Sequence, residues 1–147
     1  MKITICGSTA FIEQMEKISN DLKSLGHEVQ MPPVKFVDGD GKEWHTSDYY
    51  KFKKSDPFND PQFLKHHSQR IRDHFNKVEW SDAILVTNFD KNGITGYIGP
   101  NTLMEMGLAF HLKKKIFLLN LIPEVAWKEE VLGMGPVILD GDLAKIV

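Results

Sequence analysis

Residues 83–119 of the chain read AILVTNFDKNGITGYIGPNTLMEMGLAFHLKKKIFLL. Apolar runs at 83–86 and 116–119 bound this stretch, and both are short and flanked by polar residues. Such runs are typical of strands that are buried on both faces of a parallel sheet. Between them lie a loop rich in Gly and Asn and then a segment at about 102–112 that we expect to be helical. The stretch therefore predicts a strand–loop–helix–strand unit of an α/β fold.

Glu105 lies near the start of this expected helix. In open α/β sheets, ligands bind beyond the carboxyl ends of the strands, where loops enter helices. The spacing from Thr102 to Glu105 is that of a capping box, which places Glu105 in the first helical turn. Two roles are open to a carboxylate there, as a helix cap or as a functional acid. The helix dipole would favour its ionised form, which suits a nucleophile.

Glycines flank the same region. Gly99 and Asn101 precede the expected helix and leave backbone N–H groups free to meet a ligand. Gly107 lies inside the helix, where glycine costs about 1 kcal/mol relative to alanine, so we expect a strand or ligand to approach closely there.

Near the N-terminus, Gly7 and Ser8 lie between an apolar strand and a helix. A turn of that kind holds a phosphate or is an ordinary tight turn, and both interpretations stay open.

Strands and helices alternate along the rest of the chain. Further strands are expected at 2–6, 27–31 and 137–139, and further helices at 10–25, 62–80 and about 124–132. This alternation predicts a doubly wound, mostly parallel sheet of four or five strands flanked by helices, which is a Rossmann-like or flavodoxin-like α/β fold. With 147 residues, the chain is expected to form a single domain, 1–147.

The segment 34–61 shows no sustained periodicity and is rich in charged, aromatic and turn-forming residues. A loop this long in a compact domain is usually a lid, a binding loop or disordered, and the aromatic content argues against disorder. We favour a substrate lid that supplies an aromatic side chain for base stacking. The alternative is a surface loop packed on a neighbouring subunit.

The helix at 62–80 carries His66, Arg70 and His74 along one flank. These residues do not predict a metal site, because Arg is no ligand, the two His are eight residues apart and no carboxylate completes the set. A basic flank near an anionic ligand is the better interpretation, and a solvated face is better still for His66. We expect neither a metal nor a cofactor.

Composition narrows the class of protein. The formal net charge of −2 argues against binding of a nucleic-acid polymer. The single cysteine, Cys6, excludes an internal disulfide and a cysteine metal cluster, and we expect it to be a small buried apolar residue. No apolar run approaches the ~20 residues of a membrane span, and the N-terminus lacks the apolar core of a signal peptide. We therefore expect a cytoplasmic protein without membrane contact.

With these residues placed, the sequence resembles the nucleoside 2-deoxyribosyltransferase-like superfamily, which includes nucleoside 5′-monophosphate N-glycosidases. The resemblance covers most of the chain outside 34–61. Its anchors are Cys6-Gly7-Ser8, Ser81-Asp82-Ala83 and residues 99–109 around Glu105. It implies that Glu105 attacks C1′ of a (deoxy)ribosyl group to form a covalent glycosyl-enzyme, from which water or a second base takes the sugar. It also implies a homodimer or higher homo-oligomer.

The resemblance also implies substrate-binding residues. Gly7, Ser8, Gly99 and Asn101 match positions that cradle a 5′-phosphate or 5′-hydroxyl group. Asn88, which follows the strand at 83–87, is a further expected substrate-binding residue.

The sequence departs from the family at two usual catalytic positions. The family's second acid falls on His74, with Asp73 beside it, and its first-strand tyrosine falls on Thr4. His74 would protonate the leaving base, or Asp73 would do so if the register shifts by one residue. Glu105 nearby would raise the pKa of His74, and Arg70 would lower it.

Two functions follow for this fold. The favoured one is N-glycosidic bond cleavage or deoxyribosyl transfer on a nucleoside or nucleoside monophosphate. The alternative is a non-catalytic nucleotide-binding or sensor domain, in which Glu105 caps the helix and contacts the ribose.

Overall fold

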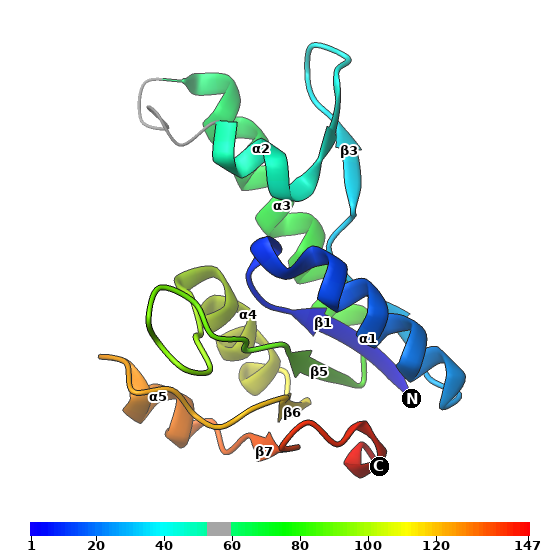
Figure 1. Cartoon of the computed structure of the whole chain (residues 1–147), viewed down its shortest axis with the longest axis vertical. Coiled ribbons are helices and arrows are strands. Elements are labelled where there is room, and N and C mark those ends of the chain that lie inside the picture. The colour runs from blue at the N-terminus through cyan, green and yellow to red at the C-terminus, as the bar shows by residue number, and fades with distance from the viewer. Residues whose placement is uncertain (53–59) are drawn as a thin grey trace.

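Five parallel strands form the central sheet, in the order β2-β1-β5-β6-β7 (Figure 1). The structure is a computed structural model that describes residues 1–52 and 60–147. The strands are β1 (Lys2–Cys6), β2 (Glu28–Gln30), β5 (Ala83–Val86), β6 (Lys115–Leu118) and β7 (Val137–Ile138). The predicted doubly wound α/β sheet is therefore confirmed, and every strand pair in it is parallel.

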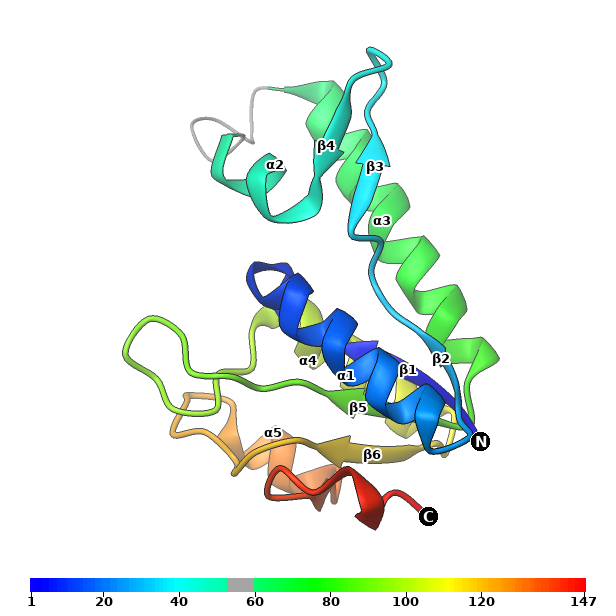
Figure 2. The same cartoon turned by 45° about the vertical axis from the view of Figure 1, so that its right-hand side comes forward.

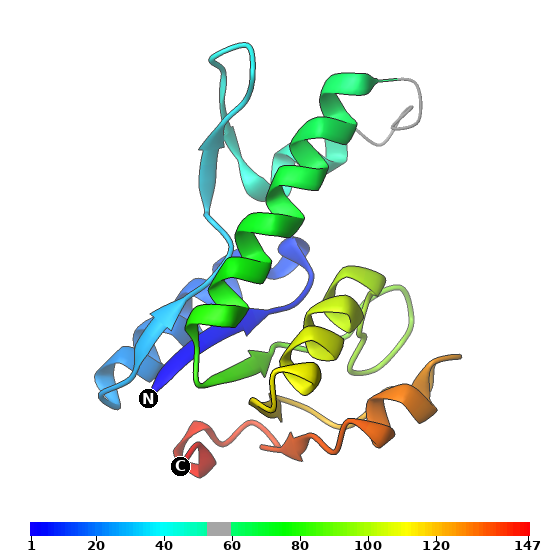
Figure 3. The same cartoon turned by 180° about the vertical axis from the view of Figure 1, so that it is seen from behind.

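Helices cover both faces of the sheet, as Figures 1 and 3 show from opposite sides. One face is covered by α1 (Ile12–Ser24), which follows the short 3-10 helix η1 (Thr9–Phe11). The other face is covered by α3 (Pro61–Trp80), α4 (Pro100–His111) and α5 (Lys128–Gly133). A second 3-10 helix, η3 (Leu143–Lys145), lies near the C-terminus. In the described residues, no helix combines the length and the apolar character needed to cross a membrane.

The side chains of β1 point alternately to the two faces of the sheet and so contribute to two separate parts of the core. Ile3 and Ile5 are fully buried in the cluster that contains α1. Cys6 is fully buried in the cluster on the opposite face, with residues from α3 and α4. Successive side chains of a strand point to opposite faces, so the last residue of β1 points toward α3 and α4.

The start of α4 differs from the prediction. The N-cap is Gly99 rather than Thr102, with Pro100 in the first turn, and no side chain caps the helix. Proline's fixed φ suits the first helical position, so the helix begins earlier than the capping-box spacing indicates. Glu105 therefore lies in the second turn and caps nothing. The expected close approach at Gly107 is also wrong, because a Cβ there would meet nothing within 4 Å.

The segment 34–61 contains regular structure, contrary to the prediction of a long loop. β3 (Lys35–Val37) and β4 (Glu43–His45) form an antiparallel hairpin, and α2 (Thr46–Phe52) follows. The Asp38 carboxylate closes the hairpin by accepting hydrogen bonds from Trp44 Nε1 at 2.6 Å and from Lys42 N at 3.0 Å. Strands of three residues are too short to show a period, which explains the error. Residues 53–59 of the expected loop lie outside the described residues.

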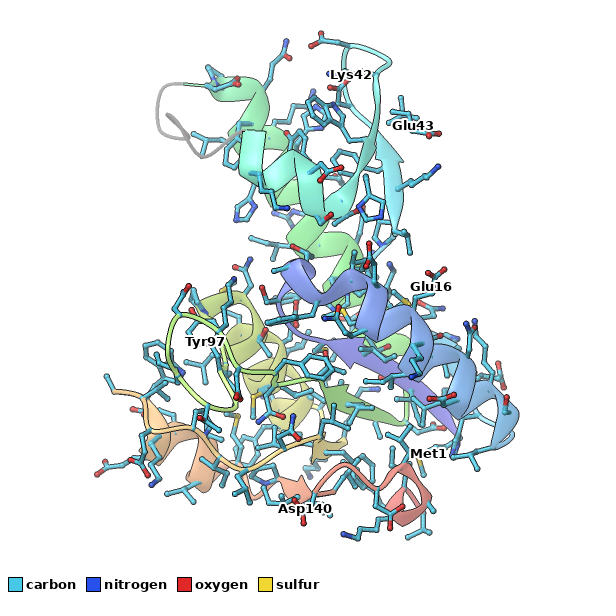
Figure 4. All side chains as sticks on the ribbon, in the orientation of Figure 1. Met1, Glu16, Lys42, Glu43, Tyr97 and Asp140 are labelled. Carbon is cyan, nitrogen blue, oxygen red and sulfur yellow. The ribbon has the colours of Figure 1, made fainter. Side chains whose placement is uncertain are left out.

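The hairpin, α2 and the first half of α3 form an arm that extends away from the sheet (Figure 2). Lys42 and Glu43 mark its tip, at the opposite end of the molecule from Asp140 (Figure 4). The rest of α3 continues from the arm across one face of the sheet, ending at Trp80 just before β5. This helix therefore connects the arm to the sheet.

Candidate active site

A cavity of about 450 Å³ lies beyond the carboxyl end of β1, between α3 and the start of α4. Its walls come from the loop after β1, from the middle of α3, from the segment leading into β3, and from the first two turns of α4. In the order β2-β1-β5-β6-β7, β2 is added on one side of β1 and the later strands on the other, so the topological switch point lies between β1 and β5. Ligands of open α/β sheets bind at such a switch point, and the volume suits a small-molecule ligand.

Glu105 and His74 face each other in the wall of this cavity. His74 Nε2 lies 3.7 Å from Glu105 Oε1, and the two side chains are 10% and 12% exposed. The His74 ring also hydrogen-bonds the backbone of Ile5. Among the described residues, neither His74 Nε2 nor Glu105 Oε2 has a hydrogen-bond partner. Two ionisable side chains from different helices therefore meet in the cavity wall, each with one buried polar atom that has no hydrogen-bond partner among the described residues.

Burial sets the protonation of this pair. It raises the pKa of Glu105 to about 8 and lowers the pKa of His74 to about 4. Loss of water disfavours the charged form of each group. Between these two values the pair holds one proton and no net charge. The expected ionised Glu105 is thus wrong. Of the two opposite shifts that were open for the His74 pKa, the structure shows the lowered one.

A neighbouring cation adds to the effect of burial on the pKa of His74. Lys77 contributes to the lowered pKa of His74, in the role that the sequence analysis assigned to Arg70. The Arg70 guanidinium instead lies 4.6 Å from the centre of the Phe36 ring. Glu105, in the second turn of α4, is too far from the free N–H groups of the helix start for the dipole to outweigh burial.

Cys6 lies beside the pair. It is fully buried, and its pKa is raised first by burial and then by the neighbouring Glu105. The thiol, the imidazole and the carboxylate each place a potential ligand atom within 4.8 Å of the other two. The sequence predicted the burial of Cys6 but not this contact. The alternation along β1, which turns Cys6 toward α3 and α4, is the signal that would have found it.

The loop after β1 and a lysine form another part of the cavity wall. Lys91 Nζ donates to Ser8 Oγ at 2.8 Å, and both residues line the cavity with Gly7. Gly7 has a φ of +153°, and a Cβ there would lie 2.6 Å from Thr87 Oγ1. The close packing at this turn therefore requires glycine. Sequence reasoning missed Lys91, whose signal is a single cation in the Gly- and Asn-rich loop after β5.

Three other predicted site residues also line the cavity. Gly99 and Asn101 lie at the start of α4, and Asp73 lies on α3. Asp73 is exposed, and its carboxylate accepts a hydrogen bond from Gln69 Nε2 at 2.8 Å. His74, not Asp73, therefore faces Glu105. Tyr97, on the loop between β5 and α4, is an additional lining residue (Figure 4).

The structure places Asn88 outside the group of described residues that line the cavity. Its side chain is buried and donates to the carbonyl of Leu121 at 2.9 Å, while its Oδ1 accepts from Asn120 N at 2.9 Å. Asn88 thus joins the ends of β5 and β6, which corrects its predicted contact with the substrate. Thr4, at the family's tyrosine position, is also buried and donates to the carbonyl of Lys77 at 2.7 Å.

Comparisons with known proteins give structural similarities only. No protein-family model matches the chain, and no curated protein matches it. A 2-deoxyribosyltransferase from the psychrotolerant bacterium Bacillus psychrosaccharolyticus is 17% identical with a TM-score of 0.45, covering 80% of this chain and 71% of that one. The CMP N-glycosidase BcmB of Clostridium botulinum is 15% identical with a TM-score of 0.49, covering 94% of this chain and 85% of that one.

These two solved structures are a 2-deoxyribosyltransferase and a CMP N-glycosidase, which are the kinds of enzyme that the sequence resembles. At such low identities and TM-scores, the similarities carry no part of the case for a reaction. That case rests on the side chains in the cavity.

Proposed function

We propose that this chain cleaves the N-glycosidic bond of a nucleoside or nucleotide, or transfers its glycosyl group, with Glu105 as the nucleophile. The observation that carries the proposal is the pairing of Glu105 and His74, 3.7 Å apart in a cavity at the carboxyl edge of the sheet. A carboxylate is an established nucleophile toward glycosidic carbons. Lys91 and Ser8, elsewhere in the cavity wall, would favour a substrate with a 5′-phosphate.

The single proton of the pair supplies both groups that the first step needs. His74 takes the proton from Glu105, which leaves a carboxylate and an imidazolium. The carboxylate attacks C1′ and forms a glycosyl ester, while the bond from C1′ to the base breaks and the base leaves with the imidazolium proton. The pair must close from 3.7 Å for this transfer, as catalytic hydrogen bonds often do when substrate binds.

The second step returns the pair to its starting state. Water or a second base attacks C1′ of the ester, and the bond between C1′ and the Glu105 oxygen breaks. His74 accepts the proton that the attacking group loses. The site then again holds one proton shared between the imidazole and the carboxylate.

Burial of the pair serves this reaction. A neutral acid and a neutral imidazole avoid most of the desolvation penalty that a resting ion pair would carry in the same place. When the proton moves, the carboxylate forms in a site where little water competes with C1′ for it. The same features would suit a nucleotide sensor in one respect, because the protonated Glu105 is a hydrogen-bond donor to a ribose hydroxyl.

Release of free base distinguishes the two functions. The purified chain is incubated with nucleosides and with their 5′-monophosphates, and free base is measured by chromatography. We expect release from at least one substrate and none from Glu105→Gln or Glu105→Ala. Calorimetry with the same ligands provides the control: binding without release by the wild-type chain would favour the sensor and overturn the enzymatic proposal.

A further inference from the structure

Three potential metal ligands converge on one point from three separate elements. Cys6 ends β1, His74 lies on α3 and Glu105 lies on α4. Their ligand atoms lie within 4.8 Å of one another. The proposed reaction uses His74 and Glu105 but gives no role to the thiol of Cys6. The side chains of α3 alone do not predict a metal site, whereas here the carboxylate and the thiol come from elsewhere in the chain.

The orientation of His74 is that of a metal-binding histidine. Its ring is held by a hydrogen bond to the backbone of Ile5, while Nε2 is buried without a partner among the described residues. Metal-bound histidines commonly use one nitrogen for the metal and donate the other N–H to a backbone carbonyl. The side chain is 10% exposed, so an unused nitrogen in this place needs an explanation.

The spacing of the ligand atoms also fits a metal ion. In a tetrahedral site with bonds of about 2.0–2.2 Å to nitrogen and oxygen, two ligand atoms lie about 3.3–3.6 Å apart. His74 Nε2 and Glu105 Oε1 are 3.7 Å apart, so the two atoms need to move very little. Without a shared cation or proton, two lone pairs would face each other across this distance.

We propose that Cys6, His74 and Glu105 bind one zinc-type divalent cation, whose fourth coordination position opens toward the cavity. Thiolate, imidazole and carboxylate together favour Zn²⁺ over Mg²⁺ or Ca²⁺, which prefer oxygen ligands alone. Three protein ligands and one open position are the arrangement of zinc sites that stay accessible to small molecules. Binding releases the thiol proton of Cys6 and the carboxyl proton of Glu105 to solvent.

The cation would regulate the site. This consequence rests on the proposed function, because a Glu105 oxygen that coordinates zinc is not available to attack C1′. His74 Nε2, bound to the same ion, cannot carry the proton that the leaving base requires. Zinc would therefore inhibit base release reversibly, and a chelator would restore it.

Binding is tested on the full chain without any nucleotide. Co²⁺ serves as the spectroscopic probe, because a thiolate bound to Co²⁺ gives a near-ultraviolet charge-transfer band. Cys6 is the only cysteine in the sequence, so the band has one source. We expect a band that saturates at one Co²⁺ per chain and is displaced by Zn²⁺. A chain that shows no such band would overturn the proposal.

Variants assign the ligands. Cys6→Ala should abolish the band, and His74→Asn should weaken Zn²⁺ binding by more than the roughly 10- to 100-fold typical of a change outside the coordination sphere. His66→Asn is the matched control, because His66 lines the cavity but lies outside the cluster. Cys6→Ser, which keeps the size of the side chain, replaces Cys6→Ala if the latter does not fold. Unchanged Zn²⁺ affinity in a folded Cys6 variant and in His74→Asn would overturn the site.

Inhibition is measured separately from binding. We expect Zn²⁺ to stop base release by the wild-type chain, and half-inhibition of Cys6→Ala, relative to its own zinc-free rate, to need at least about tenfold more Zn²⁺. Stoichiometric binding without base release under any condition would remove the proposed reaction and leave the metal site standing. Base release that continues with saturated Co²⁺ or Zn²⁺ would overturn the regulatory role.

Discussion

Glu105 and His74 reach the cavity from α4 and α3, and burial favours the neutral form of each side chain. Each has lost most of its solvent, and His74 Nε2 lies 3.7 Å from Glu105 Oε1. In a poorly solvated site, transfer of the proton within the pair changes no net charge. The neutral pair can therefore form the two species that glycosyl transfer needs, a carboxylate and a proton donor, by moving one proton from Glu105 to His74.

The pH dependence of turnover tests this shared proton. With a chelator present, kcat/KM should follow a bell with limbs near about 4 and about 8. Below the lower limb His74 is already protonated and cannot accept the Glu105 proton. Above the upper limb the pair has lost its proton, so the leaving base receives none. These limbs belong to the pair as a whole.

His74→Asn distinguishes a mechanism in which Glu105 and His74 share a proton from one in which Glu105 acts alone. Without the imidazole, turnover should be lower and should rise with pH to a plateau as Glu105 ionises, so the alkaline limb disappears. Substrate affinity should stay close to that of the wild type. A variant that weakens binding and keeps the bell would make His74 a binding residue.

A further prediction concerns the free energy of unfolding of Glu105→Gln and its dependence on pH. The unfolded chain ionises Glu105 near pH 4.5 and the folded chain near about 8, so the wild type loses stability as pH rises between them. At pH 7 the loss is roughly 3 kcal/mol. Glutamine has no such cost, so we expect the variant to be more stable at pH 7. Its advantage should shrink toward pH 4.5.

Urea unfolding at several pH values, with a chelator present, measures this difference. His74 is present in both proteins, so the difference between them reports Glu105 together with its coupling to His74. An equal free energy of unfolding for the two proteins across this range would show that Glu105 is not buried as a neutral acid.

Among the elements, the turn after β1 is the most constrained part of the site. In Gly7→Ala the new Cβ would lie 2.6 Å from Thr87 Oγ1, at a φ of +153°. We expect a loss of about 1–3 kcal/mol in the free energy of unfolding. Gly107→Ala is the matched control in α4, where the Cβ meets open space. It should gain about 1 kcal/mol, and denaturant unfolding measures both.

If Gly7→Ala were as stable as the wild type, the turn would have to move away from β5. The cavity wall that Ser8 forms with Lys91 would then be adaptable rather than fixed by packing.

Most of the elements of the sheet and its helices could be predicted from the sequence, because each has its own apolar period or run. The start of α4 could not, because Gly99 and Pro100 compete locally with the capping-box spacing. The β3–β4 hairpin could not, because its strands are too short and its turn is fixed by contacts of the Asp38 side chain. Local patterns thus predict elements but not their exact ends.

The site was predictable only in part, for a related reason. Glu105 was placed at a cavity from its position after β5. Its position beside His74 and Cys6 depends on how three elements pack, and no spacing within one element encodes that contact. Likewise, the amide of Asn88 is engaged by backbone groups that are 32 and 33 residues away in sequence.

At the scale of the whole molecule, the arm is packed by its own aromatic side chains. The rings of Phe36 and Tyr49 are 4.9 Å apart, and those of Trp44 and Tyr49 are 5.5 Å apart. Phe36 and Val37 also line the cavity. The base of the arm is therefore placed to cover a bound ligand, and we propose that it provides the substrate lid expected from the sequence.

We also propose that the chain forms a homodimer or a larger homo-oligomer, as its resemblance implies. Apolar side chains that remain exposed on α3 and α4 would be buried in that assembly, among them Leu64, Met104 and Phe110. Light scattering at micromolar protein measures the mass in solution. We expect at least twice the chain mass, and a monomer at these concentrations would contradict the proposal.

The central claim is that Glu105 becomes covalently bonded to the sugar. The most direct measurement is the mass of the protein after rapid quenching with a nucleotide analogue that carries fluorine at C2′, which slows the second step. We predict a mass increase equal to one glycosyl group, located on the peptide that contains Glu105 and missing from Glu105→Gln. Base release by the wild-type chain with an adduct on another residue, or base release retained by Glu105→Gln, would contradict the account.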